Sequence, residues 1–194
     1  MSTTGRESIE AGREVLEAAA SSASAEQLTE CGDQLLGVTR FLVDQPRLRR
    51  ALSDPAREAD DREGLVRRLI ADQVGAIAAD VAAALVRGRW GSPSELVGGT
   101  EQLAVKALLL AATEEGTLAN VEDELFRFGR LVDGDADLAS ALGASGTDPK
   151  GRAALVEQLL EGKAEPVTVK LAAASCFGIG GRSFHASLAH LVEA

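Results

Sequence analysis

Apolar residues recur every three to four positions along most of this chain, a spacing that places them on one face of an α-helix. The pattern breaks at glycine, proline and short polar stretches, and these breaks set the predicted helix ends. No stretch alternates strictly between apolar and polar residues as a half-buried strand would, so we predict an all-α fold. In the first half, helices are predicted over 7–20, 26–43, 46–52, 61–72, 75–88 and 93–113.

Three short stretches carry residues that commonly begin a helix. In "SPSE", Ser92 is predicted to be the N-cap, Pro93 the first helical residue and Glu95 the side chain that reaches back to the cap. In "TDPK", Asp148 and Pro149 take the first two of these roles, and the dipeptide "EP" opens a further helix. The second half of the chain is therefore predicted to be helical as well.

The chain also resembles itself at an offset of ninety residues, which places 31–84 over 121–174 without a gap. Most of the matching positions are apolar, as expected for two copies of one helical unit. Identical residues occur at Asp33/Asp123, Leu35/Leu125, Arg40/Arg130, Leu48/Leu138, Ala51/Ala141, Leu52/Leu142, Arg62/Arg152, Leu65/Leu155, Val66/Val156, Leu69/Leu159 and Ala82–Ala84/Ala172–Ala174.

This repeat predicts two tandem six-helix-type bundles that share the helix near 93–113. The predicted division places an extra, duplicated helical bundle at 1–92 and a second bundle at 93–194.

The stretch "CFGIGGRS" (176–183) raises the possibility of a phosphate-binding loop, because glycine leaves backbone N–H groups open to an anion. Its position in the repeat argues against that, since the offset places it over "RGRWGS" (87–92), a predicted turn between helices. Both stretches end a helix at glycine, which tolerates left-handed backbone geometry, and restart at a serine cap. No strand precedes either stretch and no lysine follows the glycines, so we interpret both as helix–helix turns.

Composition narrows the class of protein further. Of 194 residues, 45% are hydrophobic and only 3% aromatic, which suits packed helices better than a β-sandwich. The net charge of −10 and the scattered Lys and Arg residues argue against nucleic acid as a partner. No apolar segment is long enough for direct membrane insertion. The two cysteines, Cys31 and Cys176, are typical of a reducing compartment.

Candidate chemical groups all have a simpler structural interpretation. His185 and His190 are five residues apart, so they do not share a helix face as metal ligands would, even with Cys176 nearby. Cys176 ends an Ala-rich helix and is predicted to be buried. The sequence therefore predicts no catalytic residue, no cofactor and no metal. The remaining candidates are Glu114-Glu115, Glu122-Asp123-Glu124 and Trp90. We interpret the first as a pair of acidic residues, the second as acidic residues that open a helix, and Trp90 as a side chain packed at a corner between helices.

The segment 101–142 resembles the delta subunit of the F-type ATP synthase, whose mitochondrial relative is the oligomycin-sensitivity-conferring protein. The family pattern has a helix with aromatic-Ala-x-Ala-Leu, small and acidic residues, a glycine, and a second helix before an "x-L-x-x-x-L" segment. Leu103 stands where the family has its aromatic residue, which is a departure. The matching residues are Ala104-Val105-Lys106-Ala107-Leu108, Glu114-Glu115-Gly116, Leu125 and Leu138/Leu142.

The resemblance covers the whole chain if 1–92 is an added copy of the family's N-terminal domain, as in the longer delta subunits of actinobacteria. The family continues into a C-terminal α/β domain with "GG" and "DGS" motifs, which is absent before Ala194. We therefore expect this chain to be a fragment truncated before that domain.

The resemblance implies a non-catalytic stator protein that links the catalytic head of the synthase to the peripheral stalk. In the family, the N-terminal domain holds the N-terminal helix of an alpha subunit in a groove between its first and fifth helices. In the family, the C-terminal domain makes most of the contacts with the b subunit of the stalk. The implied location is the cytoplasmic face of the cell membrane, as a peripheral part of the complex. A helical-repeat scaffold with an unrelated protein partner is the alternative.

Carried onto this sequence, the groove lies between the first and fifth helices of the second bundle, at 97–113 and 165–177. The helix at 93–113 carries more apolar residues than one buried stripe of about 100° needs, which fits either a second packed neighbour or a partner. The first copy is expected to bind more weakly, because Val15 and Ala18–Ala19 are smaller. The predicted groove residues are Val105, Leu108, Leu109, Ala112, Val169, Ala172 and Ala173.

Overall fold

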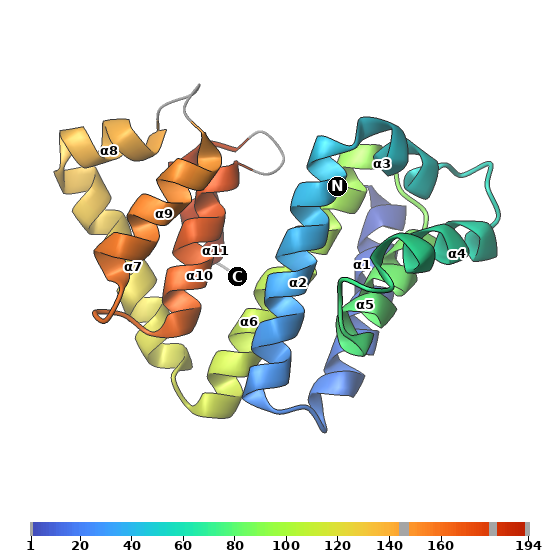
Figure 1. Ribbon diagram of the computed structural model, residues 1–194, viewed down its shortest axis with the longest axis horizontal. Coiled ribbons are helices and arrows are strands. Elements are labelled where there is room, and N and C mark those ends of the chain that lie inside the picture. The colour runs from blue at the N-terminus through green and yellow to red at the C-terminus, as the bar shows by residue number, and fades with distance from the viewer. Residues whose placement is uncertain (1, 144–147, 179–181, 193–194) are drawn as a thin grey trace. The chain divides into compact units, whose positions relative to one another are not determined.

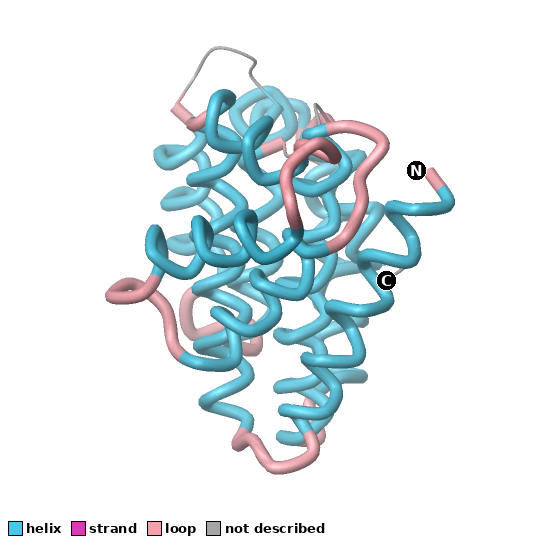
Figure 2. Tube along the Cα trace, turned by 90° about the vertical axis from the view of Figure 1, so that its right-hand side faces the viewer, coloured by secondary structure: helices cyan, strands magenta, loops and turns pink. Residues whose placement is uncertain are grey.

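The computed structural model describes residues 2–143, 148–178 and 182–192 of the chain. All its regular structure is helical, and Figure 2 shows no strand among these residues. The all-α prediction is therefore confirmed for the part of the chain that is described. The helices are α1 (Thr3–Ala20), α2 (Ala25–Asp44), α3 (Pro46–Ser53), α4 (Ala59–Ile70), α5 (Ala76–Arg87), α6 (Pro93–Glu115), α7 (Leu118–Gly134), α8 (Ala136–Gly143), α9 (Pro149–Leu160), α10 (Pro166–Ala174), the 3₁₀ turn η1 (Ser175–Phe177) and α11 (Phe184–Val192).

Helix starts follow the predicted caps with one exception in detail. The Ser92 hydroxyl accepts a hydrogen bond from the backbone N–H of Glu95 at 3.3 Å, and α6 begins at Pro93 as predicted. Asp148 caps α9 by accepting from the N–H of Lys150. The Glu95 carboxylate, however, does not return to Ser92. It accepts from the N–H of Gly91 and from the backbone and hydroxyl of Ser2, so it fixes the start of α1 as well.

The chain divides into two compact units, Met1–Ala111 and Ala112–Ala194. Helix α6 runs across the division, with its last turn in the second unit. The arrangement as two tandem six-helix bundles that share one helix, and the division between 92 and 93, stay predictions.

Glycines let the helices of the first unit approach one another closely. A Cβ added at Gly12 of α1 would lie 2.6 Å from Cδ1 of Leu103 on α6. A Cβ at Gly32 of α2 would lie 2.6 Å from Cγ of Leu108, also on α6. Such approach distances exclude any larger side chain without a shift of its neighbours. Helix α6 therefore packs on both α1 and α2, and leucines fill the space that the glycines leave.

Trp90 lies at the turn between α5 and α6 and closes one end of the first unit. It is buried, and its Nε1–H donates to the carbonyl oxygen of Leu85 at 2.9 Å. The interpretation of Trp90 as a packed corner residue is confirmed, because its apolar ring is in the core and its one donor is satisfied.

The second unit is smaller and is built from α7, α8, α9, α10 and α11 (Figure 1), whose apolar side chains form its core. Rings from two helices meet in it, with Phe128 of α7 and Phe184 of α11 edge to face at 6.3 Å between centroids. The fully buried positions of α7 recur at helical spacing, so one stripe of that helix faces the core. The main buried apolar residues are Val121, Leu125, Phe128, Val132, Leu142, Val156, Leu171 and Phe184.

Helices α5 and α10 are held at their N-terminal ends by side chains from equivalent places in the repeat. In the first unit the amide oxygen of Gln34 accepts from the N–H of Gly75, the residue before α5, at 2.7 Å. In the second, the carboxylate of Glu124 accepts from the N–H of Glu165, the residue before α10, at 2.9 Å. Donor and acceptor positions are both ninety residues apart.

The C-terminal ends of the same two helices are each held by an arginine. The Arg62 guanidinium donates to the carbonyl oxygens of Gly88 at 2.7 Å and Arg87 at 3.1 Å. The Arg152 guanidinium donates to the carbonyl oxygens of Cys176 at 2.8 Å and Leu142 at 2.9 Å. These bonds satisfy carbonyls that a helix end leaves without an internal donor. Arg62 and Arg152 thus each bond a carbonyl just beyond the end of α5 or α10, whereas their second acceptors differ, because Leu142 belongs to α8.

Candidate functional site

The seven residues predicted to line a partner groove are divided between the two units. Val105, Leu108 and Leu109 of α6 lie in the first unit, whereas Ala112 and the three α10 residues Val169, Ala172 and Ala173 lie in the second. Leu109 and Val169 are half-buried and the other five are buried. The groove itself stays a prediction, and these two residues are the members of the set that keep appreciable accessible surface.

The burial of Leu108 has an identifiable cause. Its side chain occupies the space over Gly32 of α2, close to the point where the Ala104 carbonyl faces the same glycine. One face of α6 carries Leu103 against α1, and another carries Leu108 against α2. The sequence alone does not decide whether the additional apolar residues of α6 pack on a second helix or bind a partner. At least some of them pack on two neighbouring helices within the first unit.

The turn containing "CFGIGGRS" joins two helices in the described part. Gly178 ends η1 with φ +57°, the left-handed geometry expected there, and the Ser183 hydroxyl caps α11 by accepting from Ala186 N–H. Residues 179–181 lie outside the described residues. At the matching position α5 also ends at glycine, Gly88, and α6 restarts at the Ser92 cap, but the φ of Gly88 is −65°, so left-handed geometry is not used there. Glycine is required at that point because Ser8 of α1 lies directly against it.

The cysteines are core residues rather than nucleophiles. Cys176 and Cys31 are both buried, as predicted for Cys176. Burial raises the pKa of the Cys176 thiol to about 11 and that of Cys31 to about 12. Both thiols are therefore protonated at neutral pH, whereas a thiolate is the reactive form.

The histidine and acidic candidates also take part in local contacts. His185 Nε2 lies 3.2 Å from a carboxylate oxygen of Asp133, and the side chain of His190 lies outside the described residues. Among the described residues, no three His, Cys, Asp or Glu side chains gather as metal ligands would. Nor is any helix in the described ranges long and apolar enough to cross a membrane.

The prediction that Glu122–Glu124 open a helix is wrong, because α7 begins one turn earlier, at Leu118. The three acids take separate roles instead. Asp123 pairs with Arg127 at 2.9 Å along the helix, and Glu124 turns to α10, where it also accepts from the hydroxyl of Thr168 at 2.6 Å.

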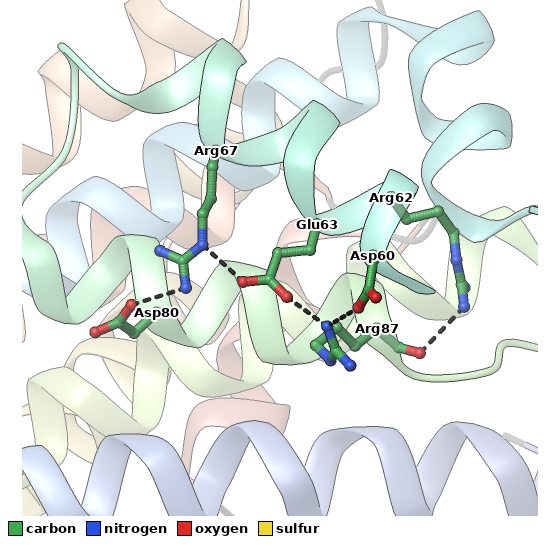
Figure 3. Close-up of polar contacts among 6 residues, drawn as sticks. All are labelled: Asp60, Arg62, Glu63, Arg67, Asp80 and Arg87. Carbon is green, nitrogen blue, oxygen red and sulfur yellow. Dashed lines mark hydrogen bonds and ion pairs between the residues drawn. The ribbon is translucent and has the colours of Figure 1, made fainter. Parts of the chain in front are cut away.

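An ion-pair cluster joins α4 to α5 on the surface of the first unit (Figure 3). Arg87 contacts Asp60 and Glu63, both at 2.6 Å, and Arg67 bridges Glu63 at 2.8 Å and Asp80 at 3.0 Å. The cluster holds two arginines and three carboxylates, and every group faces a partner of opposite charge. The cluster therefore fastens two helices together and offers no open site for a ligand.

Stability of the first unit should depend on pH through Glu63. The hydrogen bonds from Arg67 and then Arg87 hold the pKa of Glu63 below its ordinary value of 4.5. The stabilisation is therefore complete above that ordinary value and is lost as the pH falls through the lowered one. Glu63→Gln should cost about 0.5–1 kcal/mol at pH 7, because solvent screens a partly exposed pair.

Thermal unfolding at a series of pH values from neutral to acidic measures this difference. Glu14→Gln on the exposed side of α1 is the control, for which we expect little change. If Glu63→Gln lowers the stability as much in acid as at neutral pH, the ion pairs of Glu63 are not the source of the pH dependence.

The sequence is similar to those of known proteins along nearly its whole length. Residues 105–174 match the family model of the ATP synthase delta (OSCP) subunit. The chain is similar to the ATP synthase subunit delta of Salinispora arenicola, with 46% identity over 98% of this chain and 69% of that protein. The corresponding subunit of Streptomyces griseus is 39% identical over 97% of this chain and 69% of its own length. The ATP synthase subunit delta of Acidothermus cellulolyticus is 44% identical over 73% of this chain and 52% of its own length. The similarity thus extends well beyond the residues that the family model matches.

Proposed function

The chain belongs to the ATP synthase delta (OSCP) family of non-catalytic stator subunits, and from this premise we propose that it joins the catalytic head to the peripheral stalk by binding N-terminal helices of alpha subunits. The observation that carries the proposal is the similarity to delta subunits along nearly the entire chain. The b subunit of the stalk is the second proposed partner. The proposed location is the cytoplasmic face of the cell membrane, where the other subunits hold the protein.

Leu109 on α6 and Val169 on α10 are proposed to contact an alpha-subunit helix. Both are aliphatic and half-buried, so each has surface to lose to a partner and neighbours that fix its position. Recognition of an amphipathic helix depends on such anchors at helical spacing.

We also propose that the chain holds two copies of one helical domain and that α6 serves both. The hydrogen bonds that fasten α5 and α10 support this, since Arg62 and Arg152 occupy matching positions and so do Gln34 and Glu124. Independent origin of both pairs at the same offset would require two coincidences. One copy in each half is the simpler account.

The proposed binding is tested by titrating a synthetic peptide of the alpha-subunit N-terminal helix into the full chain by calorimetry. We expect a micromolar complex, about −8 kcal/mol. Leu109→Glu should weaken it by at least about 2 kcal/mol, since a carboxylate would be buried in the complex without a partner.

Ala19→Glu is the matched control, because position 19 of α1 corresponds to position 109 in the repeat. It should change the affinity by less than about 0.5 kcal/mol. If Ala19→Glu abolishes binding while Leu109→Glu leaves it intact, the first copy is the receptor and our assignment of residues is wrong.

A further inference from the structure

Helix α7 carries an exposed face whose counterpart on α2 is buried. Positions 28, 32, 36 and 39 of α2 lie on one side of the helix, and all four are buried. The positions ninety residues later are exposed or half-buried, and Phe126 shows 56% of its surface where Leu36 shows 4%. We call these later residues the Phe126 face: Leu118, Glu122, Phe126 and Gly129.

In the first unit, the matching face of α2 is covered by another helix, α6. Leu108 of α6 fills the space over Gly32 of α2, and the carbonyl of Ala104 approaches the same glycine. A helix therefore lies along the side of α2 that corresponds to the Phe126 face. Its contact with α2 depends on a small residue on one helix and an apolar residue on the other.

In the second unit, α11 reaches only one end of the face. A Cβ added at Gly129 would lie 3.6 Å from Cδ2 of Leu188, and His185 approaches Asp133 one turn further along α7. Along the rest of the face, Glu122 and Phe126 are exposed and Leu118 is half-buried. The nine residues from Leu118 to Phe126 span about 12 Å, enough for contact with about two turns of another helix.

The charges on the Phe126 face favour a basic partner. Glu122 is exposed and stands where α2 has Gly32. Its neighbours Asp123 and Glu124 are engaged with Arg127 and with the start of α10, whereas no hydrogen bond or ion pair of the Glu122 carboxylate occurs among the described residues. The chain as a whole carries a net charge of −10, which repels acidic helices and attracts basic ones.

We propose that the Phe126 face binds an amphipathic helix from another protein, one that places small residues against Phe126 and a Lys or Arg beside Glu122. The docked helix takes the position on α7 that α6 takes on α2. The exchange of Gly32 for Glu122 changes the required partner residue from an aliphatic side chain to a cationic one. This proposal is independent of alpha-subunit binding, because it uses neither Leu109 nor Val169.

The test uses a peptide built on the helix that already covers the matching face. The probe has the sequence of residues 100–115 with Leu108→Lys, capped at both ends, and it is titrated into the full chain while amide shifts are recorded. We expect saturable binding with shifts on α7. The unaltered peptide should bind at least about fivefold more weakly, and added salt should weaken the lysine peptide, because one ion pair is lost or screened.

Leu131 provides a matched control variant, since it shows the same 56% exposure on α7 but projects from a different side of the helix. Phe126→Ala should reduce the affinity for the lysine peptide at least about tenfold, whereas Leu131→Ala should change it less than about twofold. Circular dichroism checks that both variants remain folded.

Three outcomes would overturn the proposal. One is no saturable binding up to about 1 mM peptide. Another is an equal loss of affinity in the two alanine variants. The third is dimerisation of the free chain that Phe126→Ala abolishes, which would make a second copy the occupant of the face.

Discussion

Replacing Arg62 by methionine is expected to lower the free energy of unfolding by about 2–4 kcal/mol. Methionine keeps much of the apolar stem of the side chain but donates no hydrogen bond, so the carbonyl oxygens of Arg87 and Gly88 lose their donor. Each buried acceptor left without a donor costs about 1–3 kcal/mol. Urea unfolding followed by far-ultraviolet circular dichroism measures the change.

Arg68→Met on the same helix is the control, since Arg68 is exposed and its loss should cost less than about 0.5 kcal/mol. Arg62→Lys should fall between the two, because a single ammonium cannot reproduce the planar fork that serves two carbonyls. Equal stabilities of the Arg62→Met and Arg68→Met variants would show that the fastening of α5 contributes little. Arg152→Met should behave like Arg62→Met in the second unit.

Gly99→Ala is expected to lower the free energy of unfolding by about 1–2 kcal/mol. The added Cβ would lie 2.7 Å from Cη2 of Trp90 and 3.0 Å from Cγ1 of Ile9. The indole cannot easily yield, because its Nε1–H is bonded to the carbonyl of Leu85. Overpacking of this kind costs about 1–3 kcal/mol and outweighs the gain of up to about 1 kcal/mol from a better helix former.

Gly98→Ala, one residue earlier on the same helix, should have the opposite sign. A Cβ at this position meets no atom within 4 Å, so the substitution should raise the free energy of unfolding by about 0.5–1 kcal/mol. Thermal and urea unfolding of the two variants side by side measure the difference. If both substitutions lower the stability, glycine is needed at these positions for the backbone conformation and not because a neighbour leaves no room for a Cβ.

Sequence patterns predicted the helices well because the signals for helices are local. The starts of α6, α9 and α10 each follow from a proline at the first helical position, and those of α6 and α9 also from a capping Ser92 or Asp148 before it. The structure has all three starts where predicted. The predicted start of α7 lies one turn late, because the acidic run at Glu122 is a helix-start signal, whereas the true start has no proline and no side-chain cap. Local chemistry, in short, fixes helix ends wherever a proline or a cap marks them.

Packing between distant segments could be predicted much less well. The apolar pattern of α6 does not reveal that Leu108 meets Gly32, because that contact depends on how two helices cross. The hydrogen bond from Glu165 to Glu124 is not predicted from the sequence for the same reason, although a side-chain oxygen acceptor (Gln34 and Glu124) and a helix start recur ninety residues apart.

The Phe126 face illustrates both sides of this limit. The apolar pattern of each helix alone is compatible with one buried stripe. The local sequence does not show whether a second stripe of the same helix is covered by another helix. Comparison of the two copies position by position does say so, because Gly32 is replaced by Glu122 and Thr39 by Gly129. Differences within a repeat thus point to surface that one copy buries and the other leaves to solvent.

The position of Trp90 has a consequence for spectroscopy. It is the only tryptophan and the sequence has no tyrosine, so the ultraviolet emission of the protein comes from a single indole in the first unit. Unfolding of the second unit by itself changes the circular dichroism but contributes no fluorophore of its own to the emission. A denaturant titration recorded with both signals therefore distinguishes one cooperative transition from two, without a label or a mutation.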